Sequence, residues 1–174
     1  MFKKKISSLL IGSNNQGKIK EIKDLLPKNI TIYTPKNYNL KSPKENGKTF
    51  FENSLIKAKF FSKKTKIPCI ADDSGLEIDL LNGEPGICSA RWGGKKKNFN
   101  IAISKVYKKL SKINKHWFKR KTTAKFICVL TIYWPNNFSV SAIGQVKGKI
   151  SKTKKGSNGF GYDSIFIPEN KRLT

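Results

Sequence analysis

The stretch Ile67-Pro68-Cys69-Ile70-Ala71-Asp72-Asp73-Ser74-Gly75-Leu76 organises the fold that the sequence predicts. Its apolar run predicts a buried strand that ends at the two adjacent carboxylates and then turns at Ser74-Gly75. The alternation from Leu76 to Leu80 predicts a further strand. Two carboxylates at the end of a strand are a common way to hold a divalent cation, and oxygen ligands suit Mg²⁺. An Asp-Asp-Ser-Gly string also makes an ordinary turn, so both interpretations stay open at this point.

The regions on either side of this stretch alternate between strand-like and helix-like patterns. The strands are expected at residues 6–11, 30–33, 67–71, 76–80, 122–134, 138–143, 145–150 and 164–168, and the helices at 17–26, 50–64 and 98–113. Alternating βα units followed by long antiparallel strands indicate an α/β fold, a long mixed sheet with helices packed on it. No linker interrupts this pattern, so one domain over residues 1–174 is expected.

Two of the expected helices have clear signals in the sequence. Thr49-Phe50-Phe51-Glu52 is a capping box, in which the Thr hydroxyl and the Glu carboxylate accept from amides that the first turn leaves free. Spacing along this helix predicts an apolar side made of Phe51, Leu55, Ala58 and Phe61. The third helix carries a longer apolar stripe: Phe99, Ile103, Val106, Leu110 and Ile113.

The composition favours a globular protein of a reducing compartment. The chain has 174 residues, of which 37% are hydrophobic and 11% aromatic, which allows a real core. No apolar run approaches the roughly 20 residues that span a bilayer, and the basic start, residues 1–5, is not followed by a signal peptide. The three cysteines form no CxxC pair and there is a single histidine, so zinc is disfavoured. A cytoplasmic protein without membrane association is therefore expected.

The chain is strongly basic, with 36 Lys and Arg against 11 Asp and Glu and a formal net charge of +25. Such an excess is typical of proteins that bind nucleic acids through counterion release. The lysines are spread along the chain rather than clustered, which favours a solvated surface over a nucleic-acid interface. A positive field would still attract an anionic substrate.

Residues 12–18, Gly-Ser-Asn-Asn-Gln-Gly-Lys, follow a strand and open a helix. They match the phosphate-loop pattern GxxxxGK, but Ile19 stands where the Mg²⁺-binding Ser or Thr is required, which disfavours a P-loop NTPase. Free amides at a helix N-terminus together with Lys18 would still form an anion site. A capped turn with a surface lysine is the equally favoured alternative.

Three further features are candidates for chemistry. Glu45 precedes the capped helix, and Lys57 lies two turns into it, either as a snorkelling surface lysine or as a phosphate contact. The loop Gly159-Phe160-Gly161-Tyr162-Asp163 combines flexible backbone with two aromatic rings and a carboxylate. Such a loop can stack on a planar base, although its rings could also fill the core.

These features occur in an order that resembles a known family. The motifs are Ser13-x-Asn15-x-x-Lys18, Glu45, Thr49-Phe50-x-Glu52-Asn53-x-x-x-Lys57-Ala58, Ala71-Asp72-Asp73-Ser74-Gly75-Leu76, Pro85-Gly86-x-x-Ser89-Ala90-Arg91 and Gly159-Phe160-Gly161-Tyr162-Asp163. Over residues 6–168 the sequence is similar to the inosine/xanthosine triphosphate pyrophosphatases. The resemblance implies Mg²⁺-dependent hydrolysis of dITP, ITP and XTP to the monophosphate and pyrophosphate. It also implies a long sheet in two lobes around a central active-site cleft, and a homodimer.

The resemblance assigns roles position by position. Ser13, Asn15 and Lys18 would bind the triphosphate with help from Lys57, and Glu45 and Asp73 would bind Mg²⁺. Asp73 would also accept the proton from the attacking water. Ser74 would contact the substrate. The residues expected to line the base pocket are Phe160, Gly161, Tyr162 and Asp163.

Members of this family continue beyond the last strand into a helix with a substrate-binding Lys and a Ser-His-Arg motif, whereas this sequence stops at Thr174. The resemblance therefore implies a single domain that lacks this segment, with phosphate and metal handling retained and reading of the 6-oxo group of the base weakened. The alternatives are a catalytically impaired member and a basic nucleic-acid-binding module of the same fold.

Overall fold

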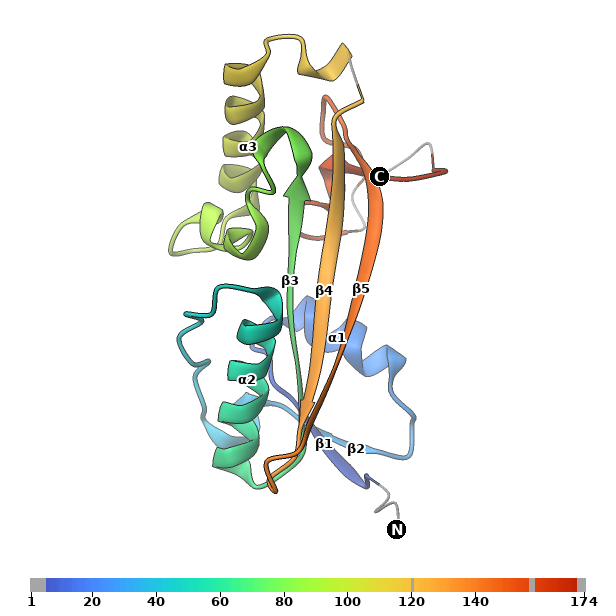
Figure 1. Cartoon of the computed structure of the whole chain (residues 1–174). Helices are drawn as coiled ribbons and strands as arrows, with labels where there is room; N and C mark the ends of the chain where they lie inside the picture. The colour runs from blue at the N-terminus through green and yellow to red at the C-terminus, as the bar shows by residue number, and fades with distance from the viewer. Residues whose placement is uncertain (1–5, 120, 157–158, 172–174) are drawn as a thin grey trace. The chain divides into compact units, whose positions relative to one another are not determined.

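The computed structural model describes residues 6–119, 121–156 and 159–171 (Figure 1). The basic start of the chain, residues 1–5, and residues 157 and 158, just before the loop that begins at Gly159, lie outside the described residues. The helices are α1 (Gln16–Leu25), α2 (Phe50–Thr65) and α3 (Phe99–Ile113). The strands are β1 (Ser8–Ile11), β2 (Thr31–Tyr33), β3 (Cys69–Ile78), β4 (Thr123–Tyr133), β5 (Ser139–Ile150) and β6 (Phe166–Pro168).

The six strands form one sheet in the order β2-β1-β3-β4-β5-β6. β1 pairs in parallel with β2 and β3, with Leu9 opposite Ile32 and Leu10 opposite Cys69. β5 and β6 are antiparallel, with Lys149 opposite Ile167. The expected α/β fold, a mixed sheet with flanking helices, is thereby confirmed. In the described part of the chain, no helix is both long and apolar enough to cross a membrane.

The chain divides into two compact units. The first contains the residues up to 73 together with 129–143, and the second contains 74–128 and the residues from 144 onward. β3, β4 and β5 each contribute residues to both units. The central cleft that the resemblance implies stays a prediction.

The core of the first unit lies on both faces of its strands, because side chains alternate along a strand. Leu9 and Ile11 of β1 pack with Ile22 of α1 on one face. Leu10 of β1 packs with Phe61 of α2 on the other. The two helices therefore cover opposite faces of this part of the sheet (Figure 1).

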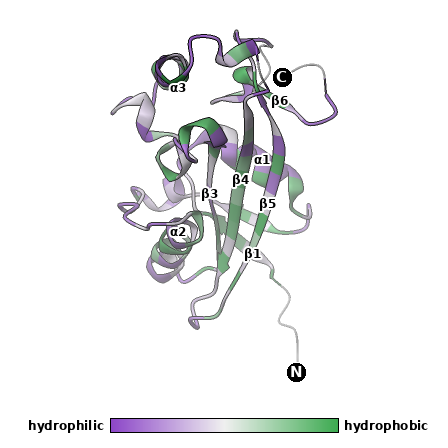
Figure 2. Cartoon of the chain, turned by 45° about the horizontal axis from the view of Figure 1, so that its top comes forward, coloured by the Kyte–Doolittle hydropathy of each residue, from purple (hydrophilic) through white to green (hydrophobic). Residues whose placement is uncertain are grey.

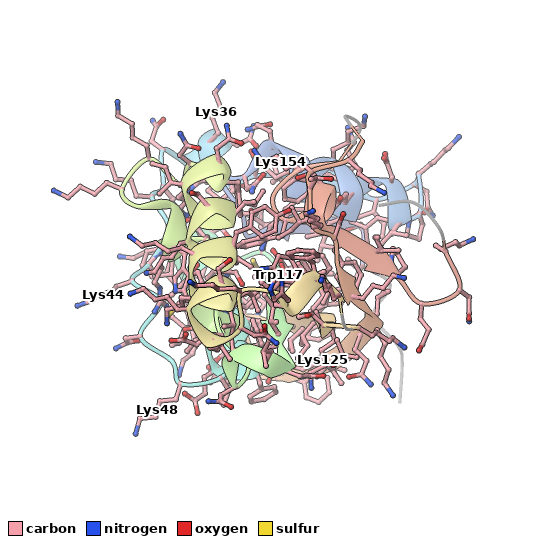
Figure 3. All side chains as sticks on the ribbon, turned by 90° about the horizontal axis from the view of Figure 1, so that it is seen from above. Lys36, Lys44, Lys48, Trp117, Lys125 and Lys154 are labelled. Carbon is pink, nitrogen blue, oxygen red and sulfur yellow. The ribbon has the colours of Figure 1, made fainter. Side chains whose placement is uncertain are left out.

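The core of the second unit forms between α3 and the strands. Ala102, Ile103, Val106 and Leu110 of α3 are buried in it. Trp117, which follows α3, is directed into this unit and stacks on Tyr107 with ring centroids 5.7 Å apart (Figure 3). β4, which is predominantly hydrophobic, supplies part of the opposing surface (Figure 2). The predicted stripe of α3 is correct except at its end, where Ile113 is exposed.

Two predictions about the strands are wrong. β3 is one continuous strand through Asp72, Asp73 and Gly75, so the turn predicted at Ser74-Gly75 does not exist. The two strands expected between residues 138 and 150 are the single strand β5. In both cases sheet pairing overrides a local turn signal.

The core-facing side of α2 also differs from the prediction. Phe51 is half exposed, and Phe50 is buried in its place. Thr49 caps the helix as predicted and accepts from the amide of Glu52 at 3.1 Å. The Glu52 carboxylate accepts from the amide of Lys48 at 2.6 Å, one residue before the position expected for a capping box.

A close approach at the end of β1 generates a stability prediction. A Cβ on Gly12 would lie 2.8 Å from Cys69 Sγ and 2.9 Å from Phe61 Cδ2, so Gly12→Ala overpacks the first core. We expect a loss of about 1–3 kcal/mol in the free energy of unfolding, measured by urea denaturation. Gly144→Ala in β5 is the control, because a Cβ there meets nothing within 4 Å. Equal losses in the two variants would contradict this account of Gly12.

Candidate active site

Asp72 and Asp73 lie on opposite faces of β3, because neighbouring side chains in a strand point in opposite directions. Asp72 faces α1, where Lys18 Nζ lies 2.5 Å from its Oδ2 atom. Asp73 faces α2, where Lys57 Nζ lies 3.2 Å from its Oδ1 atom. The adjacent carboxylates therefore contact different lysines from opposite faces of the strand, while the charge of Asp72 still acts on Lys57.

Lys57 connects Asp73 to a second carboxylate. Its ammonium lies 3.1 Å from Glu45 Oε1, and the side chain is only 8% exposed. Burial by itself lowers the pKa of Lys57, but the charges of Asp73, Asp72 and Glu45 outweigh burial and raise it. The side chain thus keeps its positive charge inside the first unit, and the interpretation as a snorkelling surface lysine is wrong.

The environment of Asp73 suits a proton acceptor. Burial raises the pKa of its carboxyl group, the charge of Lys57 opposes this shift, and the charge of Glu45 adds to it. The net result is a raised pKa. A carboxylate whose pKa is moved toward neutrality accepts a proton more readily at physiological pH.

Asn53 is a residue of this site that the sequence analysis did not assign. Its side chain is fully buried, and Nδ2 donates to Asp73 Oδ2 at 3.3 Å. Its Oδ1 atom accepts from the amide of Gly47 at 2.9 Å, in the loop that carries Glu45. Asn53 therefore fixes both the orientation of Asp73 and the position of the loop.

The polar residues on the core face of α2 explain how the helix reaches β3. The buried side of this helix carries polar residues beside the apolar Phe50 and Phe61. These polar residues are Asn53, Ser54 and Lys57. Ser54 Oγ lies 2.7 Å from Thr131 Oγ1 of β4. A polar residue at a helix position where the periodicity calls for an apolar one is the signal that could have identified Asn53 from the sequence.

The turn between β1 and α1 has the predicted strand–loop–helix context. Asn15 caps α1, and its Oδ1 atom accepts from the amides of Gly17 at 2.9 Å and Lys18 at 3.4 Å. Ser13 Oγ accepts from the amide of Asn15 at 3.2 Å. Asn15 therefore occupies two amides that an anion would otherwise use, and Lys18 is directed toward Asp72.

Glu45 and Asp73 form a donor set that suits a hard divalent cation. Both carboxylates contact one ammonium group, so a positive charge is already accommodated between them. Over residues 6–119, 121–156 and 159–171, no three His, Cys, Asp or Glu side chains gather into a metal cluster. Mg²⁺ commonly takes one or two carboxylates and completes its shell with substrate phosphates and water. The two carboxylates therefore fit Mg²⁺ and do not fit a structural zinc site.

The remaining predicted residues belong to the second unit. Ser74 directly follows Asp73 in β3 and is half-buried. Tyr162 is buried, packs edge-to-face on Phe99, and donates its hydroxyl to the carbonyl of Ser89 at 2.9 Å. Its ring is thus part of the core of this unit and links the loop to the Pro85–Arg91 motif.

The other residues of this loop are more accessible. Phe160 is 39% exposed, and Gly161 has a φ of +69°, a conformation that favours glycine. Burial raises the pKa of Asp163, and the amide of Phe160, which donates to Asp163 Oδ2 at 2.9 Å, lowers it in part. The loop therefore presents one exposed ring and one half-buried carboxyl group.

The sequence and the structure are similar to those of several known proteins. The dITP/XTP pyrophosphatase of Caulobacter vibrioides is 39% identical over 97% of this chain and 84% of its own length. That of Rhodospirillum centenum is 36% identical over 96% of this chain and 81% of its own length.

Two solved structures extend the comparison to the fold. The Staphylococcus aureus Ham1 protein superposes with a TM-score of 0.78 at 38% identity, covering 92% of this chain and 80% of that one. A HAM1 protein from Coxiella burnetii gives 0.82 at 34% identity, covering 92% and 81%. The Ham1 family profile matches residues 9–174. With a match of this extent, the chain belongs to the Ham1 family.

Proposed function

We propose that this protein is a nucleoside-triphosphate pyrophosphatase that hydrolyses dITP, ITP and XTP to the monophosphate and pyrophosphate, and so removes deaminated purines from the nucleotide pool. The observation that carries the proposal is the buried Asp73 carboxylate with a raised pKa, held between Lys57 and Asn53. Relatives that are 36% and 39% identical bear the name dITP/XTP pyrophosphatase, which supports the substrate class.

In the proposed reaction, Asp73 takes a proton from a water molecule that attacks the α-phosphorus. A bond forms between the water oxygen and this phosphorus, the bond to the oxygen that bridges the α and β phosphates breaks, and pyrophosphate leaves. Asn53 keeps the Asp73 carboxylate oriented for this step. Transfer of a phosphoryl group depends on positioning and on neutralisation of charge more than on covalent catalysis.

The remaining chemistry is charge neutralisation on the substrate. Lys18 and Lys57 supply fixed positive charge for the phosphates, and Ser13 and Asn15 offer polar groups in the turn before α1. Glu45 and Asp73 would hold Mg²⁺, which supplies Lewis-acid stabilisation of the phosphate oxygens. Ser74 would contact the substrate, and Phe160, Gly161, Tyr162 and Asp163 would line the base pocket.

Substitution of the proposed proton acceptor tests the function directly. Asp73→Asn removes the proton acceptor at almost unchanged volume, so pyrophosphate release from dITP and XTP should fall at least about 100-fold. Glu77→Gln is the matched control, because Glu77 lies in the same strand and pairs with Lys125 of the second unit. It should stay within about twofold, since no acceptor role is assigned to it.

The same assay separates the alternatives. Unmodified protein should release pyrophosphate from dITP and XTP faster than from dATP. Equal rates on dATP and dITP would contradict the base selectivity, and an Asp73→Asn variant with full activity would contradict the catalytic assignment. A folded protein without turnover on any substrate would identify a catalytically impaired member.

Metal dependence is tested by removal and replacement. A chelator should abolish activity and Mg²⁺ should restore it. Glu45→Gln should raise the Mg²⁺ concentration for half-maximal activity by roughly tenfold, the order of effect seen when groups around a metal are altered. Glu84→Gln is the control, because Glu84 is an exposed carboxylate paired with Lys109. An unchanged Mg²⁺ requirement in Glu45→Gln would remove Glu45 from the metal site.

A homodimer in the cytoplasm is the assembly we propose. Three large apolar side chains near the start of β5 support it, because Phe138, Val140 and Ile143 are each more than half exposed. Exposed apolar groups of this kind mark protein–protein contacts. Light scattering coupled to size-exclusion chromatography should give twice the chain mass of 19.7 kDa. Ile143→Lys should lower this mass, and a monomer in the unmodified protein would contradict the proposal.

A further inference from the structure

The acidic residues of this chain are distributed less evenly than the lysines. No Asp or Glu occurs between Glu84 and Asp163, whereas Lys and Arg are frequent up to Lys125 and again from Lys147 onward. Most of the stretch belongs to the second unit. The lysines of this stretch therefore have no carboxylate nearby in the sequence, and Lys109, Lys121 and Lys125 pair instead with Glu84, Glu169 and Glu77 from outside it.

Within the second unit, lysines gather around a surface hollow of about 440 Å³. It lies where the segment before β4, the end of β5 and β6 come together, over a floor that contains the buried Ile150 and Ile167. The lysines that line it are Lys119, Lys121, Lys149, Lys152 and Lys155. None of the described residues that line this hollow is acidic. At its rim, Lys121 pairs at 3.5 Å with Glu169, and both side chains are more than half exposed.

An aromatic ring stands in the same hollow. Phe118 is 36% exposed, and Lys152 Nζ lies 4.2 Å from the centroid of its ring. Proteins bind single-stranded nucleic acids with exposed rings beside positively charged groups. The ring stacks on a base while the lysines contact the phosphates. A site for one inorganic anion would have no use for the ring.

A second basic surface in the same unit has related character. The outer face of α3 carries Lys105, Lys108 and Lys112 along a hollow of about 670 Å³. Lys105 Nζ also lies 4.5 Å from the ring centroid of Trp92. Two lysine-lined hollows in one unit suit a polyanion better than a small ligand.

We propose that the hollow around Phe118 binds single-stranded nucleic acid, with its lysines on the phosphates and the Phe118 ring on a base. A membrane surface fits less well. Helices that lie on membranes expose an apolar face, whereas the apolar face of α3 is buried in the core. None of the residues assigned to hydrolysis lines this hollow, so the proposal stands independently of the catalytic one.

The lysine contacts are tested by a charge-matched pair of variants. The first variant replaces Lys121, Lys149 and Lys152 by Gln. The control replaces Lys36, Lys63 and Lys64, three exposed lysines of the first unit, so both variants lose the same charge. Lys36 extends outward from the body of the protein (Figure 3). Binding is measured by the fluorescence anisotropy of labelled oligothymidylate and oligouridylate of about 12 nucleotides, within the site sizes known for single-strand binders.

Salt dependence gives the decisive readout. Each phosphate contact adds about 0.7 to the slope of log K against log salt for single strands, so the hollow variant should lose about 2 from this slope. The control should keep the slope of the unmodified protein. Equal losses in the two triple variants would overturn the proposal in favour of attraction by net charge alone. Absence of oligonucleotide binding in the unmodified protein would overturn it outright.

The aromatic contact has its own pair of variants. Phe118→Ala should weaken binding about tenfold without a change in the salt slope, because stacking is lost while the phosphate contacts remain. Phe118→Tyr, which preserves the ring, should bind like the unmodified protein. Equal affinity of the Ala and Tyr variants would exclude a stacking role and overturn the proposal as stated.

Two further measurements separate competing explanations. Thermal melting verifies that each variant is folded, and single Lys→Gln substitutions replace the triple variant if its melting temperature falls. Phosphatidylserine vesicles test the membrane alternative, and binding to vesicles without binding to oligonucleotides would overturn the proposal. The hollow variant should hydrolyse dITP at the unmodified rate if the protein is active. A parallel loss of hydrolysis would assign the hollow to the nucleotide site instead.

Discussion

The buried ammonium of Lys57 is the constraint that organises the first unit. A charge taken out of water is stable only when it is paired, and removing one partner of such a pair typically costs about 3–5 kcal/mol. Lys57 therefore requires both Glu45 and Asp73 at contact distance. This requirement joins the loop before α2, the helix itself and the middle of β3. Asn53 strengthens the same link, since its amide bonds to Gly47 at one end and to Asp73 at the other.

The continuity of β3 determines what the two carboxylates can do. A turn at Ser74-Gly75 would have allowed both side chains to point at one cation. A continuous strand sends them to opposite faces, so Asp72 pairs with α1 through Lys18 and Asp73 with α2 through Lys57. The charge of Lys18 is thereby matched by a carboxylate that takes no part in the proposed proton transfer. Asp73 keeps its raised pKa because its surroundings combine burial with the nearby charge of Glu45.

The sequence predicted the element order, the mixed sheet and most helix boundaries, because these depend on local periodicity and capping. Thr49, Asn15 and Asn98 begin helices as their side chains favour. Two features depend on tertiary contacts, so local sequence patterns did not predict them. The turn signal at Ser74-Gly75 was overridden by sheet pairing, and the core face of α2 was misassigned by one residue because it carries polar groups. Asn53 is an intermediate case: its polar side chain at an apolar helical position is a signal in the sequence, but its contacts with Gly47 and Asp73 appear only in the structure.

Lysines act in two different physical settings in this chain. In the first unit, Lys57 is buried and paired with carboxylates, so bulk salt screens its interactions weakly. In the second unit, lysines around the Phe118 hollow are exposed, and no acidic residue occurs between Glu84 and Asp163 in the sequence. Exposed charges are screened over a Debye length of about 8 Å at physiological ionic strength. The net charge of +25 therefore combines charges that respond to salt in different ways. The buried lysine holds the Asp73 carboxylate in place, while the exposed lysines create a field whose reach depends on the surrounding salt.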